Sequence, residues 1–188
     1  MSILITSDLH FNHDKPFCWE KRGYHNVEEM NEDIVLKWNE KVKDDDTVFV
    51  LGDLILGAVG NGIHYINRLN GEIDLIIGNH DTSEKLLAYK ELSNVKIIGH
   101  SIPIESGRFR FYLSHYPTIC TPSDVVKERP SNILWNLCGH THTTNPFNDI
   151  DKGYIYHCEV DAHHMAPVSL NDIKAELIDF YCTKKNKF

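Results

Sequence analysis

Short apolar runs alternate along the chain with segments that have the spacing of amphipathic helices. Runs typical of buried strands cover residues 3–5, 48–51, 73–77, 95–98, 133–138 and 154–160. Phe109, Phe111 and Leu113 alternate with polar or amphipathic neighbours, which predicts a half-exposed strand. Strands that alternate with helices are typical of an α/β fold in which helices cover a sheet.

The clearest predicted helix begins after Asn26. Asn26 is a favourable N-cap residue, and Glu29 lies three residues further on, as in a capping box. The apolar residues that recur at helical spacing opposite a charged face are Val27, Met30, Ile34, Trp38 and Val42. These features predict a helix over residues 27–42 with one face in the core.

The other helical patterns are shorter. Residues 62–69 have the spacing of a short helix, and Ser83 is placed to cap another helix over residues 83–92. Ser169-x-x-Asp172 resembles a capping box, and the Lys-rich tail over residues 184–188 is expected to fray. No repeat, linker or low-complexity segment interrupts the chain, so residues 1–188 are expected to form a single domain.

The composition is that of a globular protein and narrows the possible partners. The chain has 41% hydrophobic and 24% charged residues, and its net charge of −8 argues against an extended groove for nucleic acid. The five cysteines are an odd number without a C-x-x-C pair, so we expect neither a disulfide framework nor a thiolate zinc site, and a cytoplasmic location. The N-terminus lacks the basic region of a signal peptide, and the longest apolar stretch is interrupted by Asp53, so no membrane association is expected.

The 12 histidines are the compositional exception, and several lie in short polar strings that follow predicted strands. The strings are Asp8-Leu9-His10, Asn79-His80-Asp81 and His140-Thr141-His142. Because open α/β sheets place their sites at the carboxyl ends of the strands, we expect the strings to converge. Asp8 and His10 would project from the same side of an extended chain and reach one metal ion, and His140 and His142 repeat that geometry.

Three further residues complete this candidate metal site. Asp53 follows Gly52 at the end of a strand, where its two carboxylate oxygens could bridge two cations. Asn79 offers a neutral carbonyl oxygen, so the ligands would not fully neutralise the cations. His115 ends the strand that contains Phe111.

The order of these motifs resembles that of the calcineurin-like metallophosphoesterase superfamily. The resemblance spans roughly residues 1 to 145 and rests on Asp8-x-His10, Gly52-Asp53, Gly78-Asn79-His80-Asp81, His115 and Gly139-His140-x-His142. It implies an α/β sandwich of two mixed β-sheets flanked by α-helices.

The resemblance also implies a role for each residue of the motifs. One metal ion would be bound by Asp8, His10, Asp53 and His142, and the other by Asp53, Asn79, His115 and His140. His80 would be the catalytic acid. Apart from the resemblance, the position of Asp81 next to His80 makes it a candidate to orient the imidazole. A mixed oxygen and imidazole ligand set suits transition metals, so we expect two divalent ions, Mn first, with Fe, Zn, Co and Ni as alternatives.

The sequence narrows the branch of the superfamily but leaves more than one function open. Leu54 follows Asp53 where the serine/threonine protein phosphatases have an Asp-Arg pair, and residues 7–13 and 113–117 look like a small bacterial and phage branch. We expect a phosphodiesterase that acts on a small nucleotide-like substrate through attack of a hydroxide bridging the two ions. A phosphomonoesterase and a non-catalytic metal-binding scaffold are alternatives, although a scaffold would not need His80.

The remaining histidines and cysteines have weaker contexts. His13, His163 and His164 are candidates to line the substrate cleft, and Asp161 is a candidate carboxylate behind the metal ligands. Residues expected to be structural are His25, His64, His100, His157, Cys18, Cys120, Cys138, Cys158 and Cys182. The sequence does not predict the oligomeric state.

Overall fold

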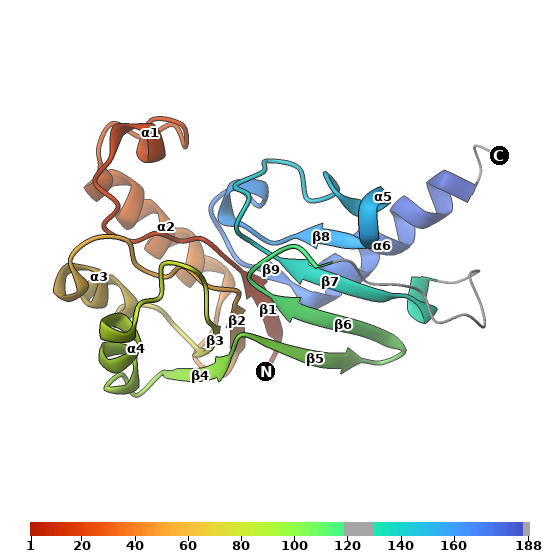
Figure 1. Ribbon diagram of the computed structural model, residues 1–188, viewed down its shortest axis with the longest axis horizontal. Helices are drawn as coiled ribbons and strands as arrows, with labels where there is room; N and C mark the ends of the chain where they lie inside the picture. Colours follow the sequence, from red (N-terminus) through yellow and green to blue (C-terminus); the bar gives the residue numbers. More distant parts are fainter. Residues whose placement is uncertain (119–129, 186–188) are drawn as a thin grey trace.

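The computed structural model describes residues 1–118 and 130–185. A first mixed sheet has the order β4-β3-β2-β1-β9 (Figure 1). Its strands are β1 (Ile3–Thr6), β2 (Thr47–Val50), β3 (Glu72–Ile76), β4 (Val95–Gly99) and β9 (Val168–Ser169). The strands β1 to β4 are parallel, and β9 pairs antiparallel to β1 at one edge.

A second mixed sheet follows in the chain and has the order β5-β6-β7-β8. Its strands are β5 (Ser101–Ser106), β6 (Phe109–Ser114), β7 (Leu134–Cys138) and β8 (Ile155–His157). The β5–β6 pair is antiparallel, whereas β6, β7 and β8 are parallel. The structure thus confirms the predicted α/β sandwich of two mixed sheets.

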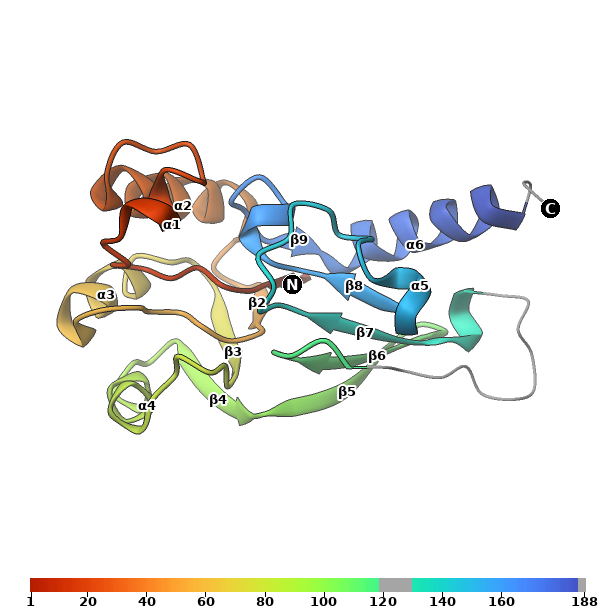
Figure 2. The same cartoon turned by 45° about the horizontal axis from the view of Figure 1, so that its top comes forward.

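Helices flank the two sheets. They are α1 (Pro16–Trp19), α2 (Val27–Lys41), α3 (Val59–Ile66), α4 (Ser83–Lys90), α5 (Ile150–Gly153) and α6 (Leu170–Lys185), with 3-10 turns at Pro130–Asn132 and Val160–Ala162. The helices α1 to α4 gather at one end of the molecule, and α5 and α6 lie beside the second sheet (Figures 1 and 2). No helix of the described ranges is long and apolar enough to span a bilayer.

The central strands β1 and β2 of the first sheet are mostly apolar because both of their faces are buried. On β2, Val48 and Val50 pack in the core beneath α2, while Phe49 faces the core between the two sheets. Successive side chains of a strand point to opposite faces, so both sets of residues must be apolar. Trp38, in the predicted apolar helix stripe, and Trp135, in the strand predicted at residues 133–138, are fully buried in these two clusters.

Local signals predicted some helix ends and missed others. The Oδ1 atom of Asn26 accepts a hydrogen bond from the Glu29 amide at 2.8 Å, as predicted for the start of α2. The helix predicted at residues 62–69 lies instead at Val59–Ile66. Gly62 packs there against Ile55, and a Cβ atom at Gly62 would lie 2.5 Å from Ile55 Cγ2. This packing is a tertiary contact, which a local helical pattern does not report.

Three other local predictions need correction. Thr82 occupies the N-cap position of α4, one residue before the predicted Ser83. The strand β5 was not predicted, and its Pro103 is a residue that disfavours strands. The proline is tolerated because β5 lies at the edge of the sheet and pairs only with β6. The helix α6 continues through Lys185, since a helix anchored in the core propagates readily, and only residues 186–188 of the expected frayed tail lie outside the described residues.

Candidate metal centre

All the predicted site residues lie on loops that follow strands at one end of the two sheets. Asp8 and His10 follow β1, Asp53 follows β2, Asn79 and His80 follow β3, His115 follows β6, and His140 and His142 follow β7. The carboxyl ends of neighbouring parallel strands lie at the same edge of a sheet, so segments far apart in sequence meet there. Both sheets therefore contribute side chains to one centre.

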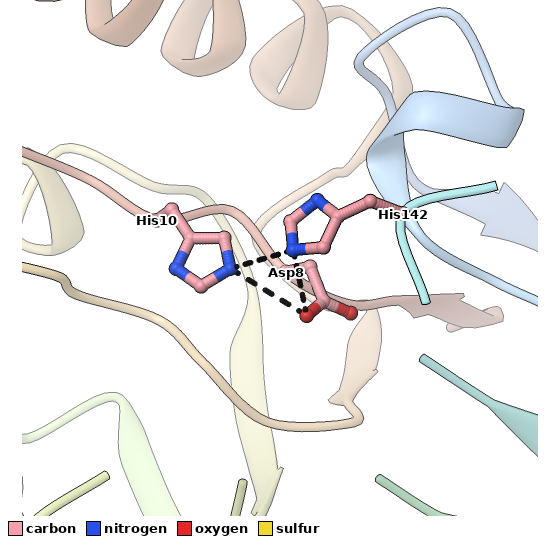
Figure 3. A group of neighbouring side chains, drawn as sticks. All are labelled: Asp8, His10 and His142. Carbon is pink, nitrogen blue, oxygen red and sulfur yellow. Dashed lines mark hydrogen bonds and ion pairs between the residues drawn. The ribbon is translucent and has the colours of Figure 1, made fainter. Parts of the chain in front are cut away.

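The first group of side chains consists of Asp8, His10 and His142 (Figure 3). Asp8 Oδ1 lies 3.6 Å from His10 Nε2 and 3.6 Å from His142 Nε2, and the two Nε2 atoms are 3.0 Å apart. Asp8 Oδ1 is buried and has no hydrogen-bond partner among the described residues. A buried carboxylate oxygen without a partner, facing two imidazole nitrogens, fits the ligand set of a divalent cation.

The second group consists of Asn79, His115 and His140. Asn79 Oδ1 lies 2.7 Å from His115 Nε2 and 2.9 Å from His140 Nδ1. The two histidine nitrogens are 3.2 Å apart. Two imidazoles and a neutral amide oxygen again point to one place, as expected for a second transition-metal site.

Asp53 lies between the two groups and faces both. Its Oδ2 atom is 3.8 Å from His10 Nε2 and 3.7 Å from His115 Nε2. The same oxygen is 4.0 Å from Nε2 of His80, whose ring is 44% exposed. Asp53 Oδ1 accepts the His80 backbone N–H at 2.9 Å. The arrangement suits a shared carboxylate with a solvent-accessible imidazole beside it.

The backbone at this centre is left-handed at most of the predicted ligands. The φ angles are 57° at Asp8, 53° at His10, 60° at Asp53, 79° at His140 and 51° at His142. Residues with a Cβ atom rarely adopt such angles, and strain of this kind concentrates at functional sites. The expectation that Asp8 and His10, or His140 and His142, project from an extended chain was therefore wrong.

Hydrogen bonds between loops hold this unusual backbone and make the side chains converge. The Asp8 amide donates to Gly52 O at 3.1 Å, and the His10 amide donates to Asp53 O at 3.1 Å. Asp8 Oδ2 accepts the His140 amide at 2.8 Å, which links the two sheets. Convergence thus depends on pairing between loops and not on a local strand geometry.

Glycines allow these loops to approach one another. Gly52 has a φ of 96°, and a Cβ atom there would lie 2.7 Å from His115 Nδ1 and 2.7 Å from the Cα of Gly78. A Cβ atom at Gly78 would collide with Asp53 Oδ1. The close approach predicted for Gly52 is therefore present, and side chains at these two positions would displace Asp53 or His115.

Arg22, which the sequence did not indicate, connects several parts of the centre. Its guanidinium donates to Asp8 O at 2.7 Å and to Leu9 O at 3.0 Å. It also binds both carboxylate oxygens of Asp161, and Asp161 Oδ2 lies 3.0 Å from His142 Nδ1. Asp161 thus stands behind a predicted ligand, as expected. Arg22 follows α1 and lies in no recognisable motif, so no local signal could have identified it.

A second buried network supports the loop after β7. Glu159 Oε1 accepts the backbone N–H of Thr141 at 3.1 Å and the Thr141 hydroxyl at 2.9 Å. The fully buried His157 lies between this carboxylate, at 3.2 Å, and Asp149, at 2.9 Å. Because Thr141 separates His140 from His142, this network fixes the segment that carries both imidazoles. The structural role expected for His157 agrees with these contacts.

Asp81 does not orient the His80 ring as expected. Its Oδ2 atom accepts the amides of Gly78 and Asp53, both at 2.9 Å. The backbone of His80 is held from the other side by Lys85, whose ammonium donates to His80 O at 2.7 Å and to Ile55 O at 2.6 Å. Asp81 and Lys85 therefore fix the loop that carries His80, while the imidazole itself remains half-exposed.

The electrostatics favour cation binding by the first group. Burial acts to raise the pKa of Asp8, but the His10 and His142 imidazoles and the Ser7 hydroxyl lower it, and the net pKa falls to about 2. Burial lowers the pKa of His10. Near neutral pH, Asp8 is therefore an anion and His10 a neutral imidazole, which are the forms that bind metal ions.

A cavity of about 520 Å³ opens beside this centre. Its lining includes His10, His80 and His142 from the centre, and His13 and Phe17 from the segment after β1. His13, one of the three candidates for the cleft, thus lines this cavity. The other two candidates, His163 and His164, line a separate hollow next to β9.

Comparisons with known proteins agree with this arrangement. A sequence model described as the calcineurin-like phosphoesterase superfamily domain matches residues 1–159. An uncharacterized protein of Methanocaldococcus jannaschii is 32% identical over 183 residues, which cover 94% of this chain and 91% of that protein. The gene 66 protein of Mycobacterium phage D29 is 24% identical over 209 residues, which cover 94% of this chain and 99% of the phage protein.

The fold has a close counterpart among solved structures. A protein of unknown function from Aquifex aeolicus superimposes with a TM-score of 0.66 at 20% identity, over 93% of this chain and 98% of that one. This likeness concerns the fold, whereas the family match covers every motif from Asp8 to His142. The chain belongs to the calcineurin-like phosphoesterase superfamily.

Proposed function

We propose that the protein is a metal-dependent phosphodiesterase that acts on a small nucleotide-like substrate. It would hold two divalent ions, with Mn as the preferred metal. The observation that carries the proposal is the position of Asp53 between two groups of donors, with Oδ2 at 3.8 Å from His10 and 3.7 Å from His115. One carboxylate facing both groups suits a site for two ions.

Each proposed ion has four protein ligands, and Asp53 belongs to both sets. Asp8, His10, Asp53 and His142 would hold one ion, and Asp53, Asn79, His115 and His140 the other. Bound divalent ions would neutralise phosphoryl oxygens and activate a water molecule for attack on phosphorus. Asn79 contributes no charge, so two carboxylates would leave the pair of ions with a net positive charge toward an anionic substrate.

His80 is the proposed general acid. Its Nε2 atom lies 4.0 Å from Asp53 Oδ2, and its ring is 44% exposed beside the cavity. The hydrogen bonds from Lys85 to His80 O and from the His80 amide to Asp53 hold the backbone, so the ring can turn toward a leaving group without moving the loop. A proton carried on His80 would pass to the departing alkoxide oxygen.

A diester is the better fit to the space around the centre. A diester carries an organic group on each side of phosphorus. The cavity has a volume of about 520 Å³ and is lined by His10, His80 and residues of α1. This volume can accommodate a retained group as large as a nucleoside. The proposal includes a cytoplasmic location, which the free thiols of Cys18, Cys138, Cys158 and Cys182 support; Cys120 lies outside the described residues.

The test is a comparison of two esters with the same leaving group after reconstitution with Mn, Mg or Ca. We expect bis-p-nitrophenyl phosphate to be hydrolysed faster than p-nitrophenyl phosphate, and Mn to restore far more activity than Mg or Ca, because imidazole ligands disfavour hard cations. A faster monoester reaction would support the monoesterase alternative. Two bound ions without hydrolysis of either ester would support the scaffold alternative.

A further inference from the structure

We infer that Phe17, Lys21 and Leu56 form a binding wall for the aromatic base of a nucleotide, immediately beside the metal centre. The inference rests on the proposed function, because it assigns the retained group of the substrate to this wall. All three residues line the same cavity as His10, His80 and His142. The substrate class would then be a phosphodiester that carries a nucleobase on its retained side.

Phe17 is an unusual residue to leave in solvent. Its side chain is 70% exposed, whereas the other described Phe, Trp and Tyr side chains, apart from Tyr116, are buried or partly buried. The Phe17 ring meets His13 edge-to-face with centroids 5.4 Å apart, and His13 lies 5.7 Å from His10. The three rings therefore run from the metal centre to the rim of the cavity. An exposed ring at that rim offers a flat apolar face on which a base can stack.

The backbone segment that carries this ring is held close to the metal centre. Phe17 belongs to α1, and the same helix buries Cys18 against the core. Arg22 follows one turn later and donates hydrogen bonds to the backbone oxygens of Asp8 and Leu9. The segment that carries Phe17 is thus tied to the segment that carries the predicted ligands. A preorganised ring gains more from stacking, because little of its freedom is lost on binding.

Lys21 adds a positive charge to the same wall. No hydrogen bond or ion pair of its ammonium is found within residues 1–118 and 130–185, and its side chain is exposed in the cavity. The protein as a whole carries a net charge of −8, so the Lys21 ammonium supplies a local positive charge on this side of the cavity. The ammonium would attract an anionic ligand, while the base of that ligand would pack against Phe17 and Leu56.

Tyr116 is the competing platform for a base. It is 51% exposed, and its ring lies 4.7 Å from the His140 ring and 5.0 Å from the His115 ring. It therefore stands on the side of the second group of donors. Phe17 is preferred because it borders the cavity and Tyr116 does not border it.

The experiment measures binding directly, by calorimetric titration of the Mn-loaded protein with adenosine 5′-monophosphate and, separately, with inorganic phosphate. The variant Phe17→Ala should weaken binding of the nucleotide about 5- to 100-fold and leave binding of phosphate unchanged, since stacking on one ring is lost. Phe17→Trp should restore or strengthen nucleotide binding. Leu87→Ala, an exposed apolar residue on α4, is the matched control and should change neither affinity.

The ratio of nucleotide to phosphate affinity decides the outcome. Equal affinities for both ligands in the wild-type protein would overturn the inference even if simple diesters are hydrolysed. A ratio that falls in Tyr116→Leu and not in Phe17→Ala would also overturn it and assign the base to the other side. A ratio that falls in Phe17→Ala in a protein that hydrolyses no ester would uphold the wall and refute the proposed phosphodiesterase activity.

Discussion

Arg22 and Asp161 form a buried two-point ion pair that joins the loop after β1 to the segment behind His142. Nε of Arg22 lies 3.0 Å from Oδ1 of Asp161, and Nη2 lies 2.8 Å from Oδ2. The two side chains are only 2% and 7% exposed. Planar, bidentate geometry of this kind holds both partners in one orientation, so the pair sets the relative positions of Asp8 and His142.

Replacement of Arg22 by Met should destabilise the metal-free protein strongly. Loss of one partner from a buried pair typically costs about 3 to 5 kcal/mol, because the other charge stays buried alone. For a chain of this size, that loss lowers the melting temperature by about 6 to 20 °C. Thermal unfolding in the presence of a chelator measures the effect.

The matched control is Arg68→Met, which breaks a two-point pair with Glu32 on the surface. That pair has contacts of 2.7 and 2.6 Å, but its side chains are 36% and 56% exposed. Its loss should cost less than about 1 kcal/mol. Similar melting temperatures for the two variants would show that burial does not distinguish the Arg22 pair.

Replacement of Asp53 by Asn should reduce metal content and activity together. The carboxylate faces both groups of donors, and the amide removes its charge from each. Elemental analysis after dialysis should find two ions per chain in the wild type and fewer in the variant. Asp74→Asn, on β3 away from the centre, is the control. A single tightly held ion in the wild type, unchanged in Asp53→Asn, would contradict the shared role.

Replacement of His80 by Ala should matter most for poor leaving groups. General acid catalysis is typically worth about 10² to 10⁴ in rate, so turnover of an alkyl or nucleoside ester should fall by a factor of that order. A nitrophenolate leaves without a proton, so nitrophenyl esters should retain much more activity, with two ions still bound. Turnover is compared across leaving groups of increasing pKa. Equal losses across the series would falsify the acid role and indicate that His80 stabilises the phosphoryl oxygens.

The stability of the metal-free protein should decline at alkaline pH through His157. Burial acts to lower its pKa, but the carboxylates of Glu159 and Asp149 raise it above the ordinary value of 6.5. A raised folded-state pKa means that the charged imidazole stabilises the protein fully below pH 6.5, and that this contribution is lost as pH rises through the folded-state pKa.

Melting temperatures between pH 5.5 and 9 check this expectation. His157→Gln should flatten part of the decline, while His64→Gln, an exposed histidine on α3, should leave the curve unchanged. The Asp161 carboxylate also raises the pKa of His142, so only the difference between wild type and His157→Gln isolates His157. If melting temperature falls with pH as steeply in His157→Gln as in the wild type, the interaction of His157 with Glu159 and Asp149 is not the cause of the decline.

The sequence by itself determined the elements whose signals are local. The helix α2 could be placed because Asn26, Glu29 and an apolar stripe act within a few turns of one another. The strands β1 and β2 could be placed because strands buried on both faces are mostly apolar. The polar strings after those strands could be assigned to one end of the sheets because parallel strands share a carboxyl edge. The superfamily could be identified because the order of these motifs resembles that of a known family.

Only the tertiary structure decided how the side chains of the centre are held. The left-handed backbone at Asp8 and His10 is held by hydrogen bonds to Gly52 and Asp53 on another loop, and no spacing in the sequence indicates these bonds. Arg22 and Asp161 are 139 residues apart, and Pro103 fits a strand only because β5 lies at an edge. Such features depend on contacts between segments that are far apart in the sequence, so the residues next to each position give no local signal for them. Local periodicity therefore predicts which segments meet, whereas packing decides the conformation in which they meet.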